Sequence, residues 1–343
     1  MKKKIIKKII IIISIVLLSF IVLNIIGVPI AYDIVFNHGH RIDFDTTPGI
    51  VNYEEYKEQY KRSNIEYTFD NHKMAGYAYM ENDTDYLIVS VHGFKDYADY
   101  LMAEDFYFVD NGYNVFSFDL SGCGNSEGTI KGFSQSLLDL EATLNFLNTD
   151  ERFKDYKKIL FGFSEGGYAT TSVLSLTEEN ILGAVSISGY YDAENLAMEK
   201  GFEYVNFISY FGKPLVWIKE KCNFNDYLSI RATDSINNSK LPVFLAHGSN
   251  DTLITYKKLD TYSKVEASDR VFKYTKEATH SGILYSDRAL EYQEKVKADL
   301  KKLSGKEKED YYKTIDDDLY GEINQELFSQ VLTFFEYCKE HWK

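Results

Sequence analysis

The chain has 343 residues, of which 45% are hydrophobic and 26% charged, an ordinary globular composition that excludes a disordered or fibrous protein. Its formal net charge is −14. Because an acidic body repels nucleic acid phosphates, we expect no nucleic-acid partner. The three cysteines (Cys123, Cys222 and Cys338) are too few for a disulfide framework or a zinc site. We expect neither a metal nor an organic cofactor, and no obligate protein partner.

Residues 1–32 have the composition of a membrane anchor. They carry five lysines, all within the first eight positions, and no acidic residue. The uncharged run 9–26 would span about 27 Å as a helix, close to the hydrocarbon thickness of a bilayer. Because basic flanks stay in the cytoplasm, we expect a single-pass membrane protein whose body lies outside it. A cleaved secretory signal is the alternative, with Pro29-Ile30-Ala31 as the nearest cleavage site.

After a lead-in at 33–63, the chain from 64 to 343 alternates short apolar runs with helical patterns. Such alternation predicts a mostly parallel sheet with helices on both faces. Only the turn around Asp70-Asn71-His72 separates the first two strands, so we expect an antiparallel hairpin there. We expect eight strands, at 65–69, 75–80, 86–91, 114–118, 158–161, 182–188, 243–246 and 270–274. We expect helices at 100–111, 133–148, 166–177, 255–266 and 323–341.

Two stretches interrupt this alternation. Residues 190–240 are rich in aromatic residues and partly helical in pattern, at 204–211 and 215–221, and we expect them to form a cap over the carboxyl ends of the strands. Residues 286–322 are strongly charged and helical in pattern. Because charge runs are mostly solvated faces, we expect a surface insertion there.

Gly162-Phe163-Ser164-Glu165-Gly166-Gly167 has the G-x-S-x-G pattern of a nucleophile elbow. It lies between the strand expected at 158–161 and the helix expected at 166–177, which is the strand–turn–helix setting that the elbow needs. Glycines permit the strained turn, and the helix N-terminus adds partial positive charge at the hydroxyl. Ser164 is therefore the predicted nucleophile. The alternative is an ordinary serine at the start of a helix.

An acyl-transfer site also needs hydrogen-bond donors for the oxyanion. His92-Gly93-Phe94 follows the strand expected at 86–91 and supplies a loop for this purpose. We predict that His92 and Gly93 form the oxyanion loop, with His92 fixing its shape. The backbone N–H groups of Phe94 and Glu165 are the predicted donors.

A serine hydroxyl needs a base within hydrogen-bond reach. His280 follows the last expected strand, and Asp251 lies in the loop His247-Gly248-Ser249-Asn250-Asp251. The order Ser164, Asp251, His280 is that of a Ser-His-Asp triad in this type of fold. A loop histidine and a helix N-cap are the alternatives for His280 and Asp251, and Asp192 is the reserve candidate for the acid.

On these residues the chain resembles the α/β-hydrolase superfamily, and within it the monoacylglycerol lipase and serine aminopeptidase-like branch. The resemblance covers about residues 64–343 and implies an α/β-hydrolase fold with about eight strands and a helical cap insertion. Relatives carry Arg and His where this chain has Ser121 and Cys123, and we interpret Cys123 as a packing residue. The motifs that carry the resemblance are His92-Gly93-Phe94, 119–126, 162–167, 247–251 and His280.

Together these features predict a membrane-anchored serine hydrolase that cleaves a small-molecule or lipid-derived ester. Aromatic residues of the expected cap suit an apolar acyl chain or simply pack the cap (Phe202, Tyr204, Phe207, Tyr210, Phe211 and Trp217). Two alternatives stay open. One is an exported peptidase or amidase, in which Glu194, Glu199 or Glu203 would bind a free amine. The other is a non-catalytic binding protein on a hydrolase scaffold.

Overall fold

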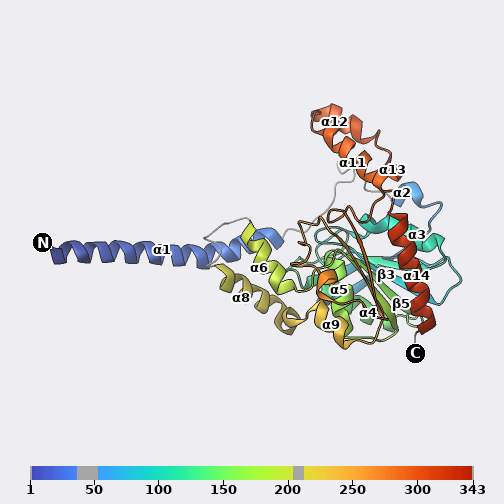
Figure 1. Cartoon of the computed structure of the whole chain (residues 1–343), viewed down its shortest axis with the longest axis horizontal. Coiled ribbons are helices and arrows are strands. Elements are labelled where there is room, and N and C mark those ends of the chain that lie inside the picture. Colours follow the sequence, from blue (N-terminus) through green and yellow to red (C-terminus); the bar gives the residue numbers. More distant parts are fainter. Residues whose placement is uncertain (1, 37–52, 204–211, 342–343) are drawn as a thin grey trace.

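The computed structural model describes residues 2–36, 53–203 and 212–341. A long N-terminal helix, α1 (Lys2–Phe36), extends from a body in which helices cover both faces of a sheet (Figure 1). The predicted helix at 204–211 lies outside the described residues, as does much of the lead-in. So do the cap aromatics Tyr204, Phe207, Tyr210 and Phe211.

All eight predicted strands are present and form one sheet in the order β1-β2-β4-β3-β5-β6-β7-β8. The pairs β1–β2 and β2–β4 are antiparallel, and every other neighbouring pair is parallel. The strands are β1 (Ser63–Phe69), β2 (His72–Tyr79), β3 (Tyr86–Val91), β4 (Asn114–Phe118), β5 (Lys157–Phe163), β6 (Ile181–Ile187), β7 (Val243–Gly248) and β8 (Val271–Lys276).

The hairpin between β1 and β2 turns at Asp70 and Asn71, whose φ angles are 46° and 61°. Aspartate and asparagine tolerate this left-handed conformation better than other non-glycine residues, and a two-residue turn of this kind matches the twist of paired strands. The predicted hairpin is confirmed.

The central strands are apolar along their whole length because helices bury them on both sides. α4 (Gln135–Thr149), α5 (Glu165–Ser172) and α9 (Ala232–Asn238) contribute to the core on one face, and α3 (Met102–Asp110) and α14 (Gln325–His341) to the core on the other. The α14 residues Leu327, Phe328, Val331, Phe334, Phe335 and Cys338 are all buried, a helical stripe that meets the sheet.

One predicted helix, at 255–266, is largely wrong. Only α10 (Thr261–Lys264) is helical there, and turns occupy most of the segment before it. Lys257 has a φ of 64°, which an α-helix does not allow. The carboxylate of Asp251 also accepts hydrogen bonds from the N–H groups of Leu253 and Ile254, which favours a tight turn instead.

The segment between β6 and β7 contains α6 (Ala193–Glu203), α8 (Lys213–Phe224), a 3₁₀ turn at Asn225–Ser229, and α9. The helix predicted at 215–221 lies within α8. Figure 1 shows α6 and α8 beside the end of α1 that meets the body. This insertion therefore lies where α1 joins the molecule.

The charged stretch forms α11 (Asp287–Leu300), α12 (Gly305–Tyr312) and α13 (Asp317–Tyr320). Figure 1 shows α11 and α12 projecting from the body, away from α1 and the insertion. Ala289, Gln293 and Val296 are the buried residues of α11, and α12 has none. This insertion is a surface feature.

Candidate active site

Ser164 lies at the sharp turn between β5 and α5, with φ 55° and ψ −113°. Two glycines make the turn possible. A Cβ on Gly162 would lie 2.2 Å from the carbonyl oxygen of Gly166, and a Cβ on Gly166 would lie 2.0 Å from that of Val91. Close backbone packing therefore holds Ser164 in a strained conformation, which is the local geometry of a nucleophile elbow.

The structure brings together the three residues predicted to form a triad. Ser164 Oγ lies 2.8 Å from His280 Nε2, and His280 Nδ1 lies 2.7 Å from Asp251 Oδ2. With Nδ1 protonated, His280 donates to Asp251 and accepts the hydroxyl proton of Ser164. This arrangement leaves the imidazole lone pair aimed at the proton that a nucleophilic serine must lose.

The carboxylate of Asp251 accepts three hydrogen bonds and lies close to His247 Nε2, which also lies 2.9 Å from the carbonyl oxygen of Ile254. Oδ1 accepts from the N–H groups of Leu253 and Ile254, at 2.8 and 2.9 Å. Oδ2 lies 3.1 Å from the fully buried His247 Nε2, in addition to its bond with His280. Burial alone would raise the pKa of Asp251, but the hydrogen bonds from His247 and His280 outweigh it and hold the pKa well below its usual value. The acid is therefore ionised and fixed in orientation.

Two further contacts position His280. The hydroxyl of Ser188 donates to the carbonyl oxygen of His280 at 2.8 Å, and the ring of Phe163 lies 5.1 Å from the imidazole, centroid to centroid. The residue types and spacing gave no sign of these contacts. His247, at the end of β7, lies four residues before Asp251, and this closeness in sequence was a signal for the contact between them.

His92 ties the predicted oxyanion loop to the neighbouring strand. Its Nε2 accepts from the N–H of Leu120 at 3.0 Å, and its Nδ1 lies 2.8 Å from the carbonyl oxygen of Gly93. Burial lowers the pKa of His92 to about 4, so the ring is neutral and donates from Nδ1. A Cβ on Gly93 would lie 3.3 Å from the Cβ of Ser164, which places the loop directly beside the predicted nucleophile.

Of the two predicted oxyanion donors, Glu165 directly follows the nucleophile and Phe94 follows Gly93, which lies beside it. Glu165 is the first residue of α5, where the helix itself offers its N–H no acceptor. Phe94 is followed by Lys95, whose φ of 59° bends the loop. Burial raises the pKa of the Glu165 carboxyl well above its usual value, which favours the neutral form of this side chain beside Ser164.

Asp192, the reserve acid, is not in the hydrogen-bond chain. Its Oδ2 accepts from Arg231 Nε at 2.8 Å and from the Asn195 amide at 3.0 Å. Cys123 is a free, buried thiol whose pKa is raised by burial, as a packing residue requires. Among the described residues no cluster of three or more His, Cys, Asp or Glu side chains is arranged to hold a metal ion.

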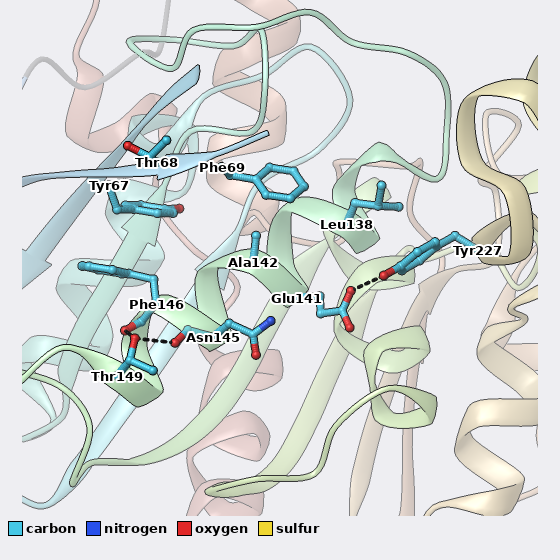
Figure 2. Close-up of a pocket in the computed structure, with 10 residues that line it drawn as sticks. All are labelled: Tyr67, Thr68, Phe69, Leu138, Glu141, Ala142, Asn145, Phe146, Thr149 and Tyr227. Carbon is cyan, nitrogen blue, oxygen red and sulfur yellow. Dashed lines mark hydrogen bonds between the residues drawn. The ribbon is translucent and has the colours of Figure 1, made fainter. Parts of the chain in front are cut away.

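A surface groove of about 540 Å³ lies elsewhere, between β1, α4 and the 3₁₀ turn after α8 (Figure 2). Glu141 accepts a hydrogen bond from the Tyr227 hydroxyl at 2.6 Å across one end of it. Neither Ser164 nor His280 lines this groove, so it is separate from the candidate site.

The fold agrees with comparisons to known proteins. The esterase Pf2001 of Pyrococcus furiosus has a TM-score of 0.53 and 21% identity over 79% of this chain and 99% of that chain. Est1E of Butyrivibrio proteoclasticus, solved with ferulic acid bound, has a TM-score of 0.51 and 17% identity over 69% of this chain and 98% of that chain. The chain has the α/β-hydrolase fold.

Residues 82–222 of this chain match the family described as serine aminopeptidase, S33. The matched part includes the predicted oxyanion loop and Ser164 but ends before Asp251 and His280. Comparison with curated protein sequences gave no match. The resemblance is therefore to serine hydrolases, and it leaves the bond that is cleaved open.

Proposed function

We propose that this protein is a membrane-anchored serine hydrolase that cleaves carboxylic esters through an acyl-enzyme. The observation that carries the proposal is the unbroken hydrogen-bond chain from Ser164 Oγ through His280 to Asp251. Support also comes from the strained serine, whose hydroxyl lies at the start of a helix beside the loop of His92 and Gly93.

In the proposed reaction, Ser164 Oγ attacks the ester carbonyl carbon while His280 Nε2 takes the hydroxyl proton. The N–H groups of Phe94 and Glu165 stabilise the oxyanion of the tetrahedral intermediate. Its collapse breaks the bond to the alcohol, which leaves with the proton from the imidazolium. A water molecule then attacks the acyl carbon with His280 as base, the carboxylic acid departs, and Ser164 regains its proton.

The anchor is the described helix Lys3–Phe36, which is long and apolar enough to cross a bilayer. A signal sequence has the same properties. We favour retention of the helix because Val28, which precedes the candidate cleavage site, lies against the insertion: a Cβ on Gly212 would lie 2.9 Å from Val28 Cγ2. We propose that the catalytic body lies outside the cytoplasm. N-terminal sequencing of the protein from its membrane fraction distinguishes the two cases, since a mature chain beginning at Tyr32 would exclude an anchor.

The test of catalysis uses the full chain in detergent, with a fluorophosphonate probe and p-nitrophenyl esters of increasing acyl length. We expect the parent to be labelled and the variants Ser164→Ala and His280→Ala not to be. A folded parent that neither takes the label nor turns over an ester would reject the hydrolase proposal and favour the binding protein.

A peptidase or amidase is the second candidate, favoured by the match of residues 82–222 to the serine aminopeptidase family. Of the acids proposed to bind an amine, Glu199 lies 2.6 Å from Lys258 Nζ in an ion pair, which would have to break. Aminoacyl p-nitroanilides offered beside the esters decide the matter. Faster turnover of the anilides would replace the esterase proposal with the peptidase one.

A further inference from the structure

One side of the last two turns of α1 packs against the body of the protein. Most of the apolar residues from Ile5 to Leu23 are at least 44% exposed, whereas Tyr32 and Phe36 are only 6% and 4% exposed. Both belong to the same core cluster as Val91, at the end of β3. Figure 1 shows this end of α1 lying against the body while the rest of the helix extends away from it.

Phe36 packs directly against the residue that is to supply an oxyanion donor. Its ring centroid lies 5.6 Å from that of Phe94 at an interplanar angle of 68°, and 5.0 Å from that of Phe133 at 86°. The rings of Phe94 and Phe133 are 5.3 Å apart, so the three form a closed cluster. Edge-to-face contacts of this kind fix the relative orientation of aromatic rings.

The loop that Phe94 belongs to needs such support. Lys95 has a positive φ, which costs a non-glycine residue free energy and persists only where the surroundings over-determine it. His92 anchors the start of the loop through its hydrogen bonds to Leu120 and Gly93. Past Gly93, the aromatic contacts with Phe36 and Phe133 hold the side chain of Phe94.

Tyr32, one turn earlier in α1, fixes the helix at this position. Its hydroxyl lies 2.5 Å from Glu220 Oε1 of α8 and 2.8 Å from the carbonyl oxygen of Lys131. Gly132 leaves room for this contact, because a Cβ there would lie 2.4 Å from the Tyr32 hydroxyl oxygen. Asp33 of α1 adds an ion pair with Lys219 of α8, at 2.8 Å.

We infer that Phe36 is a positioning residue for the oxyanion loop, so that the membrane helix is a structural part of the active site as well as a tether. This inference assumes the proposed serine hydrolase reaction. Phe36 touches no reacting atom. It acts through Phe94, whose N–H must point at the position of the oxyanion, and a displacement of about 1 Å there is costly to the rate.

The experiment measures ester hydrolysis by the full chain in detergent for Phe36→Ala, Phe36→Leu and the control Ile34→Ala. Ile34 lies in the same helical turn and is 61% exposed, so its truncation removes a similar apolar side chain without a contact to the body. We expect Phe36→Ala to lower kcat by about 10-fold to 100-fold with little change in KM. We expect Phe36→Leu to restore part of the loss and Ile34→Ala to match the parent.

A double-mutant cycle shows whether Phe36 acts through Phe94. In a Phe94→Ala background, Phe36→Ala should lower kcat by less than about 2-fold, since the contact it supports is already gone. The pH profile of kcat/KM should keep its shape, because the three-ring cluster does not contain His280. Thermal unfolding of each variant reports whether the fold is retained.

An active parent with Phe36→Ala as fast as Ile34→Ala would overturn this inference and leave the proposed function intact. The inference would also be overturned if Phe36→Ala lowered kcat equally in the parent and in the Phe94→Ala variant. It would be overturned as well if Phe36→Leu lowered kcat as much as Phe36→Ala. A folded parent that shows neither labelling nor turnover would overturn both proposals together.

Discussion

The two halves of the proposed site are held in place in different ways. We call Asp251, His280 and His247 the base half, and His92, Gly93, Phe94 and Glu165 the oxyanion half. Hydrogen bonds between β7 and the loops after β7 and β8 hold most of the base half, with one further bond to His280 from Ser188 after β6. The oxyanion half packs against Phe36 and Phe133, which lie far from Phe94 in sequence.

This difference predicts how strongly a change in each half affects the rate of the reaction. Each group in the base half makes a directional hydrogen bond. Replacing such a group removes either the acceptor for the Ser164 proton or the contact that holds the productive imidazole tautomer. Packing tolerates small displacements, so changes around the oxyanion half should lower the rate by degrees. Helix α1 contacts the proposed site at this second half, through Phe36 and Phe94.

The largest effect should follow a change in the base half. Asp251→Asn replaces an acceptor for the Nδ1 proton of His280 with an amide, which favours the wrong imidazole tautomer. We expect kcat for ester hydrolysis to fall by about 10³-fold to 10⁴-fold. Steady-state kinetics on the full chain measures this. Asp192→Asn is the control, because Asp192 pairs with Arg231 and not with His280. A large loss of kcat in Asp192→Asn with little loss in Asp251→Asn would instead identify Asp192 as the acid.

A smaller loss should follow a change in the oxyanion half. His92→Ala removes the acceptor for the Leu120 N–H and the donor to the Gly93 carbonyl, so the loop should lose its fixed shape. We expect kcat to fall by about 10-fold to 100-fold, less than for Asp251→Asn. His72→Ala is a matched control, since His72 contacts Ser121 outside the site. Equal losses in the two halves would contradict the proposed difference between them.

The same difference explains what the sequence could predict. Ser164, Asp251 and His280 follow strand ends, where parallel topology gathers side chains at one edge, so their meeting could be inferred from strand order. The β1–β2 hairpin was equally local. The docking of Phe36 onto Phe94 depends on how a helix packs against a distant loop, and no spacing in the chain encodes that.

The misplaced helix at 255–266 has a similar cause. Its composition permits a helix, but Asp251 accepts from two backbone N–H groups at the start of the segment, and Lys257 adopts a positive φ. The side chain that supports His280 thus also sets the turn that follows it. The hydrogen bonds of Asp251 thus override the intrinsic helix propensity of this segment.

The third prediction concerns stability away from both halves. Burial raises the pKa of Glu104 in α3 to about 8, so the folded state holds a proton that the unfolded state loses near pH 4 to 5. The stabilising contribution is full at low pH and is lost as pH rises through about 8. Near pH 6 the slope for this single group approaches about 1.4 kcal/mol per pH unit.

Thermal unfolding at pH 5.5, 7 and 8.5 checks this expectation. We expect Glu104→Gln to reduce the fall in Tm between these pH values, and Glu291→Gln in α11, an exposed position, to leave it as in the parent. A fall in Glu104→Gln as steep as in the parent would show that the pKa of Glu104 is not raised in the fold.

The smallest effect should come from the charged insertion, which touches neither half. Arg288 of α11 is 74% exposed at its side chain and pairs with Glu322 at 3.1 Å. Exposed ion pairs contribute little, so Arg288→Ala should cost no more than about 1 kcal/mol of unfolding free energy and leave kcat unchanged. Chemical denaturation and ester kinetics measure the two quantities. A lower kcat in Arg288→Ala would contradict this expectation. Because α11 and α12 project away from α1, such an effect would have to reach the site through α14 and the loop of His280. The base half would then depend on a distant part of the chain, as the oxyanion half does.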